Sequence, residues 1–509
     1  MPGSARSRFS RPTSAEHDVS TSLLAQTRSR TPLAGSYPAA VSMALVALCP
    51  FIVLSTASLL ITQLSADLHA SAFGTQLADG LSNAGYAFGA VVAADLTQRL
   101  PAWRVYVLAE AGFAVGSLLA AAASGIVEFT VGRVLQGIAT GMLLVVALPP
   151  LITRHGAARV PLSAAFVNLG LFGMVTLGPV VGGIAAAEKA WRLLFIVMGG
   201  VGAVGVVLGL LAFERADARS PRMGFDWSAI PVALAATVLP FFGVSWLSRG
   251  GFGSPAFYLP VVAGMLALCA LLVRQYRKND ALMPLKLISH TLPVTGIATA
   301  MVTGAAVTAS VELAVVYLLQ VQHESVAVTG TILGTQVVGL VAAALLFKMA
   351  LRTRWLPAFA LVGLGVAGVA GALLLGLGGG RTIWIVAVAG VLLGFAAGAG
   401  VTPGLFMAGL SVPSGRLGPA FAMVELLRSE AAFLVAPIIL QIVLLFSDPT
   451  QGIRFAALIL VLLCAVCGAL ILAVLLLGGA RPHAPDLDLW VGGEQPAYHS
   501  PRLGAAIRR

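Results

Sequence analysis

Runs of about 20 apolar residues, each long enough to cross a bilayer as a helix, recur along almost the whole chain. Short segments rich in charged residues, proline and glycine separate these runs. This pattern predicts an all-α polytopic membrane protein with fourteen transmembrane helices. The predicted spans are 38–64, 79–97, 104–123, 127–150, 161–185, 193–213, 228–246, 257–273, 292–319, 327–349, 356–376, 382–406, 420–446 and 453–479.

The composition supports this assignment. Of the 509 residues, 10% are charged and 58% are hydrophobic, whereas soluble domains contain about 25% charged residues. A water-soluble protein of this length could not hide so much apolar surface. The net charge of +11 raises the question of nucleic acid, but the basic residues are scattered through short loops and form no phosphate-binding face. We therefore expect a lipid bilayer, and no nucleic acid, around this chain.

The basic residues also predict the orientation in the membrane. An even number of spans puts both termini on one side, and Arg and Lys concentrate in the short loops of that side. The positive-inside rule places those loops, and therefore both termini, in the cytoplasm. Abundant Ala, Gly and Val, with Arg preferred over Lys, indicates a bacterial plasma membrane protein. The polar segments 1–36 and 480–509 are expected to be disordered cytoplasmic tails.

A weak internal repeat divides the spans into two halves. GAVVAADLTQRLPAWRV, which starts at Gly89, is similar to GLVAAALLFKMALRTRW, which starts at Gly339. Repeated halves with a substrate site between them near the midplane are common in secondary transporters. The predicted units are a six-helix bundle at 37–213, two additional helices with their loops at 214–290, and a second six-helix bundle at 291–479.

An arginine lies inside the fourth predicted span, where a charge costs about 2.5–3.5 kcal/mol on insertion scales. Arg133, Gly137 and Gly141 follow one another at four-residue intervals. Gln136 and Thr140 lie beside them, so the face is small and polar and suits a neighbouring helix better than lipid. The alternative is an arginine that snorkels to water, but such an arginine needs no glycines beneath it. Arg133 is therefore predicted to face the interior.

Two adjacent spans carry motifs of a known family. RVLQGIATG resembles the Arg-x-x-Gln-Gly-x-x-x-Gly signature in the fourth helix of the major facilitator superfamily. LGPVVGG, with Gly178, Pro179, Gly182 and Gly183, is similar to the Gly-Pro-x-x-Gly-Gly signature of its antiporters. Because proline removes a backbone donor and glycine permits close helix contact, this segment is expected to govern bending.

The resemblance extends to a particular branch of the superfamily. GFDWSA and RQYRKNDALMPLKLI resemble the flanks of the two extra central helices in the fourteen-helix drug:proton antiporter branch. The resemblance implies two six-helix bundles plus two central helices, alternating access and a monomer. It also implies export of drug-like or amphipathic small molecules in exchange for protons.

The sequence departs from the pattern of this branch at three places, one of which is Leu345, which stands in the second half at the position that corresponds to Asp95. The loop after the second span usually reads Gly-x-x-x-Asp-Arg-x-Gly-Arg-Arg, and VVAADLTQRL keeps only Asp95 and Arg99 of its charged residues. A gating salt-bridge network is therefore expected to persist in part. The branch usually places an aspartate in the first span, where our alignment puts Val53. The usual proton carrier is thus missing.

Two other acids are candidates for proton coupling. Glu312 in the ninth span shares a small, polar stripe with Ala305, Thr308 and Ala309, which points its carboxyl at the bundle interior. A buried acid of this kind can exchange protons, and Arg133 would tune it. Glu110 in the third span is the second candidate. The alternative for both is a structural carboxylate that bonds to a neighbouring helix or reaches the membrane surface.

Polar side chains within the spans are candidates for a substrate cavity. They are Gln63, Tyr86, Gln136, Asn168 and Gln336. Glu425 and Arg428 are expected to form a structural pair near the cytoplasmic end of the thirteenth span, and Asp67 and Asp79 to flank the first outer loop. The sequence contains no recognisable Ser–His–Asp arrangement, metal-ligand cluster or phosphate loop, so we expect no enzyme activity, cofactor or metal.

Two further functions stay open at this point. The empty acid position in the first span also fits a uniporter, or an exporter of an endogenous lipid or metabolite without the usual proton coupling. The third alternative is a non-transporting membrane receptor or scaffold, although an inert scaffold has no need for polar residues within the membrane.

Overall fold

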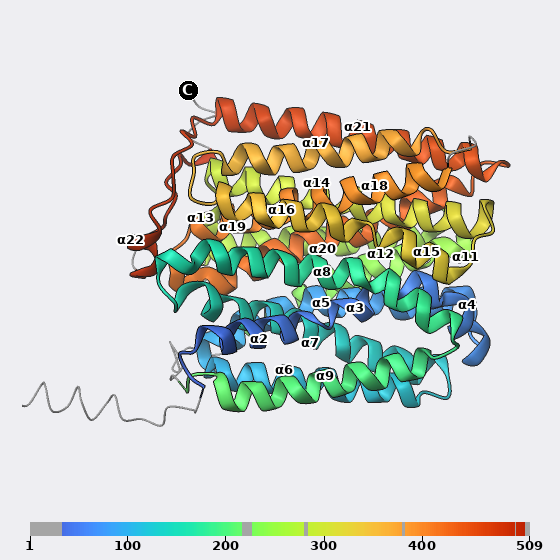
Figure 1. The fold of residues 1–509 in the computed structure, drawn as a ribbon, viewed down its shortest axis with the longest axis horizontal. Helices are drawn as coiled ribbons and strands as arrows, with labels where there is room; N and C mark the ends of the chain where they lie inside the picture. Colours follow the sequence, from blue (N-terminus) through green and yellow to red (C-terminus); the bar gives the residue numbers. More distant parts are fainter. Residues whose placement is uncertain (1–32, 216–225, 279–282, 379–381, 494, 504–509) are drawn as a thin grey trace, which may run out of the picture.

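The computed structural model describes residues 33–215, 226–278, 283–378, 382–493 and 495–503. Long helices run side by side, and the first and the last long helix, α2 and α21, have their terminal ends at the same end of the bundle (Figure 1). We call this the terminus-bearing end and the opposite one the far end. Most of the predicted tail 1–36 lies outside the described residues.

The N-terminal half (Figure 1, blue to green) contains the first six spans. Its first span is broken into three helices, and the other five are single helices. A short 3₁₀ turn, η1, precedes the fifth span. The elements are α2 (Tyr37–Leu48), α3 (Phe51–Leu54), α4 (Ala57–Asp67), α5 (Ala72–Arg99), α6 (Ala102–Ala122), α7 (Ile126–Thr153), η1 (Ala157–Arg159), α8 (Val160–Ala187) and α9 (Trp191–Ala212).

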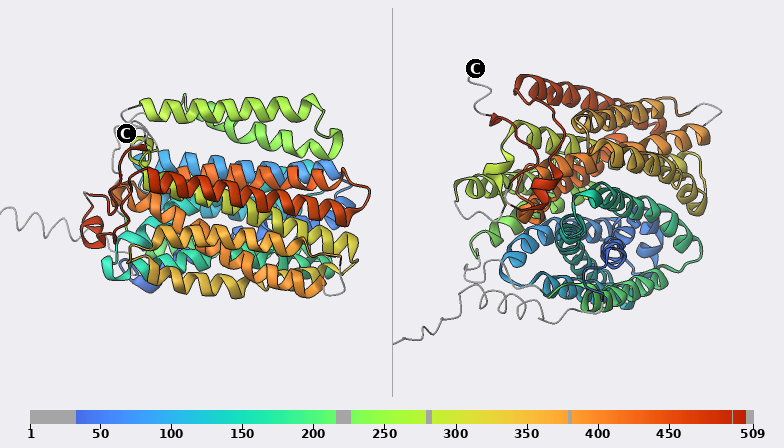
Figure 2. Two further views of the ribbon diagram at one scale, coloured as in Figure 1. Left: turned by 90° about the horizontal axis from the view of Figure 1, so that it is seen from above. Right: turned by 60° about the vertical axis from the view of Figure 1, so that its left-hand side comes forward.

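Two additional long helices separate the halves in the sequence. They lie together along one side of the molecule (Figure 2, left, light green), where α10 contacts α5 of the N-terminal half and α20 of the C-terminal half. The elements of this region are α10 (Ile230–Ser245), α11 (Leu247–Gly250), α12 (Pro255–Arg277) and α13 (Leu285–Ile288).

The C-terminal half (Figure 1, yellow to red) repeats the six-span arrangement. Two of its spans contain a π-helical turn, η2 or η3. The elements are α14 (Thr291–Val316), η2 (Tyr317–Val321), α15 (Val326–Leu333), α16 (Gln336–Ala350), α17 (Leu356–Leu374), α18 (Thr382–Ala396), η3 (Ala397–Val401), α19 (Thr402–Leu410), η4 (Ser414–Arg416), α20 (Leu417–Val443), α21 (Pro449–Leu477) and α22 (Leu487–Val491).

The helix count supports the predicted architecture. Within the described residues, 13 helices are long and apolar enough to cross a membrane. The second predicted span, α5, is a 28-residue helix that runs beside α7, but its composition is too polar for it to be among those 13. The all-α polytopic fold class is confirmed, and α5 supplies the fourteenth predicted span. Ser71 caps α5, since its Oγ accepts a hydrogen bond of 3.1 Å from the backbone N–H of Gly74.

The predicted repeat corresponds to equivalent helix contacts in the two halves. A methyl group on Gly89 of α5 would overlap the backbone oxygen of Ile138 in α7. A methyl group on Gly339 of α16 would overlap the backbone oxygen of Val391 in α18. In each half, therefore, the glycine of the repeated sequence lets the second span approach the backbone of the fourth.

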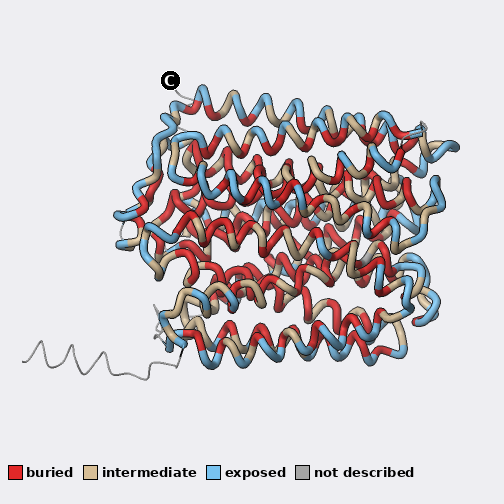
Figure 3. The backbone as a smooth tube through the Cα atoms, viewed as in Figure 1, coloured by how far each residue is buried: buried red, intermediate tan, exposed pale blue. Residues whose placement is uncertain are grey.

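Apolar side chains cover the outside of the bundle. Exposed residues follow the outer helices, including α21 along the top and α6 and α9 along the bottom of Figure 3. Large exposed side chains on these helices and on α12 include Leu108, Val204, Leu266 and Leu470. A surface of this kind suits lipid rather than water. Polar side chains are instead found buried among the helices, as the next section describes.

The segment after α21 differs from the disordered tail expected for 480–509. It crosses the terminus-bearing end of the bundle and contains α22 (Figure 1, left). Trp490 is fully buried, and its Nε1 donates a hydrogen bond of 2.9 Å to the backbone oxygen of Val412. The N–H of Ala497 donates to the oxygen of Leu410 at 2.8 Å. Carbonyls left free beyond the end of α19 thus obtain partners, and this holds the segment in place.

Candidate functional site

Arg133 of α7 forms an ion pair inside the bundle. Its Nη2 donates a hydrogen bond of 3.0 Å to Oδ1 of Asp79 in α5. Its Nη1 donates at 3.2 Å to Oε1 of Gln136, and the guanidinium lies 5.9 Å from the ring centre of Phe195. The Arg133 side chain is 3% exposed and that of Asp79 is 33% exposed. Arg133 therefore faces the interior, as predicted, with an acid as its partner.

The glycines of α7 explain why Arg133 is held there. A methyl group on Gly137 would overlap the backbone oxygen of Ser82, and one on Gly141 would overlap that of Tyr86. The hydroxyl of Ser82 also donates a hydrogen bond of 2.9 Å to the backbone oxygen of Arg133. This close contact of α5 with α7 fixes the rotation of α7 and aims Arg133 at Asp79.

Asp79 does not flank the first outer loop, where the sequence analysis placed it. Because α5 begins at Ala72, Asp79 lies about two turns inside the helix, at about 10 Å from its start. Val53, which occupies the position of the missing acid, lines a small pocket together with Asp79 and Arg133. The carboxylate beside Arg133 thus comes from α5 instead of the first span.

Glu312 approaches this pair from the C-terminal half. Its carboxyl lies close to Ser58 in α4 and to Asp79 in α5. α4 and α14 are in contact, and Leu59 of α4 belongs to an apolar cluster made mainly of C-terminal-half residues. We call Asp79, Arg133, Glu312 and Ser58 the acid–arginine cluster. It joins the two halves near the far end.

Glu110 has different surroundings. It is fully buried within the N-terminal half, where its carboxyl lies against Gly205 of α9 and has Tyr106 as a polar neighbour. The Tyr106 hydroxyl donates a hydrogen bond of 3.1 Å to the backbone oxygen of Met43 in α2. Glu110 is therefore placed between helices of one half and apart from the acid–arginine cluster.

The Gly-Pro motif of α8 packs on two sides. A methyl group on Gly178 would overlap Oγ of Ser55, and one on Gly182 would lie 3.0 Å from Cβ of Thr56, so these glycines contact the break between α3 and α4. A methyl group on Gly183 would lie 2.7 Å from the backbone oxygen of Val326 in α15.

Pro179 also faces the C-terminal half. A methyl group on Gly330 of α15 would overlap the backbone oxygen of Pro179. The motif therefore connects the broken first span, which carries Ser58, with the C-terminal half near the far end. Because the break that this motif contacts lies directly before α4, the motif is adjacent in structure to Ser58 of the acid–arginine cluster.

Two of the five predicted cavity residues bond within their own half. Gln136 donates through Nε2 to the hydroxyl of Ser117 in α6 at 2.8 Å. Gln336 donates to the backbone oxygen of Leu333 at 3.1 Å. Gln63 of α4 is half-buried, and its Oε1 has no hydrogen-bond partner among the described residues.

Asn168 of α8 connects the two halves. Its Nδ2 donates a hydrogen bond of 3.0 Å to the backbone oxygen of Gly398, and its Oδ1 accepts one of 2.9 Å from the hydroxyl of Thr402. Asn168 is fully buried. The π-helical turn η3, which contains Gly398, thus meets the N-terminal half through a side-chain amide.

Tyr86 of α5 makes the second polar connection in the middle of the bundle. Its hydroxyl donates a hydrogen bond of 2.6 Å to Oε2 of Glu425 in α20, and it accepts one of 3.3 Å from Nη2 of Arg428. Arg428 Nε donates to the same Glu425 oxygen at 2.8 Å. The expected Glu425–Arg428 pair is confirmed, but it also includes a residue of the other half. We call these three residues the midplane triad.

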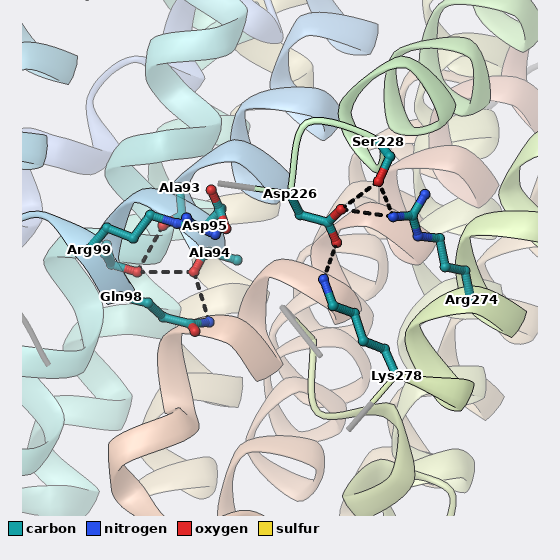
Figure 4. A network of polar contacts seen from close by, with 10 residues as sticks. Ala93, Ala94, Asp95, Gln98, Arg99, Asp226, Ser228, Arg274 and Lys278 are labelled. Atoms are coloured by element: carbon teal, nitrogen blue, oxygen red, sulfur yellow. Dashed lines mark hydrogen bonds and ion pairs between the residues drawn. The ribbon is translucent and has the colours of Figure 1, made fainter. Parts of the chain in front are cut away.

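The gating candidates Asp95 and Arg99 form an ion pair within α5 at its terminus-bearing end. Figure 4 shows this pair beside a second group, in which Asp226 accepts hydrogen bonds from Arg274 at 2.8 Å and Lys278 at 2.7 Å. Burial raises the pKa of Asp226, but the hydrogen bonds and charges of its neighbours, Lys278 foremost, outweigh this effect and lower the pKa.

The fold consists of two six-helix bundles and two additional helices, with charged side chains buried among them. The model of the Major Facilitator Superfamily matches residues 43–370. The chain therefore belongs to the major facilitator superfamily.

Known proteins support a more specific resemblance. The chain is 28% identical over 224 residues to the "Multidrug resistance protein B homolog" of Mycobacterium tuberculosis, a match that covers 44% of this chain and 41% of the relative. It is 26% identical over 220 residues to the "Tetracenomycin C resistance and export protein" of Streptomyces glaucescens, which covers 43% of this chain and 41% of that protein. Each match spans about two fifths of the relative's length. These relatives support the resemblance to the drug-efflux branch.

Solved structures agree with the fold. A POT family transporter in complex with a thioalcohol-conjugated peptide has a TM-score of 0.60 at 13% identity, over 86% of this chain and 96% of that one. The human organic anion transporter MFSD10 has a TM-score of 0.57 at 15% identity, over 86% and 99%.

Proposed function

We propose that this protein is a secondary active exporter of drug-like or amphipathic small molecules, driven by proton antiport with alternating access. The observation that carries this proposal is the acid–arginine cluster. Asp79 pairs with the buried guanidinium of Arg133, and Glu312 of the other half lies near Asp79. Full ionisation of both carboxyl groups therefore leaves one excess negative charge within the membrane. One bound proton removes that charge, and burying an unpaired charge there is costly.

The cluster couples a proton to movement of the halves in the following way. Arg133 and Asp79 belong to the same half and stay together when the halves move. Glu312 belongs to α14 and keeps its neighbours Ser58 and Asp79 only while the far ends of the halves are in contact. Separation of the far ends changes the charges around Glu312 and gives it access to water, so a proton is exchanged there.

The direction of transport follows from two supporting arguments. The basic loops support a cytoplasmic position for the terminus-bearing end in a bacterial plasma membrane. In addition, two relatives are named for drug resistance or export. The Pro179 motif supplies the bending contact between the broken first span and α15. The protein works as a monomer, because both halves of the site lie in one chain.

The test is dye efflux from cells, with and without a protonophore, at matched membrane expression. We expect the wild type to show protonophore-sensitive efflux of an amphipathic dye, and Asp79→Asn and Glu312→Gln to lose it. Glu110→Gln is the matched control, since it neutralises a buried acid within the N-terminal half and should leave the protonophore sensitivity in place.

Other outcomes support other functions. Efflux that is insensitive to the protonophore would favour a uniporter or an exporter of lipid or metabolite with other coupling. Loss of coupling in Glu110→Gln alone would move the proton site to that residue. Absence of flux for a broad compound panel would favour a receptor or scaffold.

A further inference from the structure

The midplane triad holds two opposite charges at the contact of the two halves. Glu425 is fully buried and Arg428 is 6% exposed. Both belong to α20, three residues apart, and Arg428 Nη2 donates to Glu425 Oε2 at 2.5 Å. Among the described residues, the Tyr86 hydroxyl is the group that connects this pair to α5 of the other half. A single phenol group thus links this charged pair to the N-terminal half, beside the separate Asn168 link.

The position of the triad matches a substrate site. Tyr86 is the fifteenth residue of the 28-residue helix α5, which puts it near the middle of the membrane. Substrate sites of two-repeat transporters lie near the midplane, between the repeats. Any motion that separates α5 from α20 takes the Tyr86 hydroxyl away from Glu425. The Glu425 carboxylate then lacks the hydrogen bond that this hydroxyl donates.

One atom of the triad already lacks a partner. Oε1 of Glu425 is buried and accepts no hydrogen bond from the described residues. A buried carboxylate oxygen without a hydrogen-bond donor is costly. A ligand that donates a hydrogen bond to this oxygen removes that cost, so the bond contributes more to binding than the same bond would in water. The pair therefore offers a free acceptor on Glu425 and, when Tyr86 leaves, donors on Arg428.

Charge balance restricts which ligand can use this pair. A simple cation that binds Glu425 competes with Arg428 and leaves the guanidinium buried without a counter-charge. A simple anion on Arg428 leaves Glu425 in the same condition. Breaking a buried pair in this way is strongly unfavourable. A molecule with one positive and one negative group satisfies both side chains at once.

We propose that the midplane triad binds the charged groups of the transported molecule, and that this molecule is dipolar, with a cationic amine and an anionic group on an apolar body. This inference rests on the proposed function and names its substrate class. Glu425 binds the amine, Arg428 binds the anionic group, and Tyr86 occupies the site when it is empty.

The test measures binding to the purified protein in lipid nanodiscs. The probes are a xanthene dye with one cationic amine and one free carboxylate, and its methyl ester, which is a plain cation of nearly the same size. We expect the wild type to bind the free acid about tenfold more tightly than the ester, the equivalent of about 1.4 kcal/mol. Equal binding of the two dyes, preference for the ester, or no binding of either would overturn the proposal.

Variants assign the preference to the triad. The double variant Glu425→Gln with Arg428→Gln keeps polar side chains at both positions and leaves no unpaired charge, so it should fold and should bind both dyes alike. Tyr86→Phe removes only the hydroxyl that competes for Glu425, so it should bind the free acid about threefold more tightly. A purely structural role of Tyr86 would weaken binding instead. Persistence of the tenfold preference in the double variant would also overturn the proposal.

A last variant separates this proposal from the proposed function. Glu312→Gln should lose proton-driven efflux but retain the preference for the free acid, because its side chain is not part of the triad. Loss of the preference in Glu312→Gln, with the protein folded, would contradict the assignment of binding to the triad. Wild-type binding with the predicted preference but without protonophore-sensitive efflux would contradict the coupling scheme alone.

Discussion

The helix pair α5–α7 and its counterpart α16–α18 have the same backbone packing but different chemistry. In both pairs, glycines bring one helix against the backbone of the other, as Gly137 does at Ser82 and Gly394 does at Gln336. The N-terminal pair adds the ion pair of Arg133 with Asp79. The C-terminal pair is joined by a hydroxyl instead, since Thr335 donates to the backbone oxygen of Ala387 at 3.0 Å.

This difference separates what the fold requires from what the proposed function requires. The α16–α18 contact forms without an ion pair between its helices. The equivalent packing of α5 on α7 therefore does not need Arg133 to bring the two helices together. A charge within the membrane is costly, and its presence in only one copy points to coupling rather than to packing.

The largest expected effect on stability comes from breaking the Arg133–Asp79 ion pair between α5 and α7. Asp79→Asn leaves Arg133 buried without a counter-charge and should lower the free energy of unfolding by about 3 kcal/mol, at the low end for buried pairs because the Asp79 side chain is 33% exposed. Chemical unfolding in detergent micelles measures this. The matched change Thr335→Val removes one neutral hydrogen bond and should cost about 1 kcal/mol.

A charge-neutral double variant checks the cause of that loss. Asp79→Asn with Arg133→Gln should recover most of the stability, while proton coupling stays lost. If the double variant were as unstable as Asp79→Asn, packing and not the unpaired charge would explain the effect.

The next largest effect, the loss of stability on filling a glycine contact, should be equal in the α5–α7 and α16–α18 pairs. Gly137→Ala and Gly394→Ala each put a methyl group into the backbone of the partner helix, and overpacking of this kind costs typically about 1–3 kcal/mol. Chemical unfolding of both variants in the same detergent should give values within that range. A cost confined to Gly137→Ala would show that the two contacts are not equivalent.

The sequence was sufficient for the fold class because span length, apolar composition and two adjacent motifs all point to one architecture. The sequence analysis misplaced Asp79 because the apolar residues of the second span begin only at about residue 79. The helix itself starts earlier, at Ala72, directly after its N-cap Ser71. The spacing of Asp79, Asn83 and Tyr86 on one helical face was the available signal for a buried polar stripe.

The partners across the halves could not be predicted in the same way. Asn168 meets Gly398 across 230 positions and Tyr86 meets Glu425 across 339, and no local pattern encodes such contacts. The ordered segment after α21 was missed for a related reason. Its helix α22 has only five residues, too few for a hydrophobic period, and Trp490 is buried because the ends of other helices cover it.

The smallest effect concerns an ion pair outside the membrane. The Asp226 side chain is 4% exposed, but Arg274 and Lys278 are 35% and 40% exposed where they contact it. Because both cations can turn to water outside the membrane once the acid is neutralised, Asp226→Asn should cost less than about 1 kcal/mol at neutral pH. Because folding lowers the pKa of Asp226 from 3.8, its stabilisation is present above that pH and is lost as the pH falls through the folded-state pKa. Unfolding of wild type and variant should therefore differ at neutral pH and converge in strong acid. A cost as large as that of Asp79→Asn would contradict the distinction between a pair held within the membrane and a pair whose cations can reach water.

Proton movement in proteoliposomes tests the central claim most directly. A pH-sensitive dye inside the vesicles reports the protons that move when a substrate gradient is imposed. The movement of the substrate itself is measured separately in the same vesicles. We predict counter-movement of protons in the wild type, and substrate exchange without proton movement in Glu312→Gln. Undiminished proton movement in Glu312→Gln would contradict the account, since the acid–arginine cluster would then not be where the proton is carried.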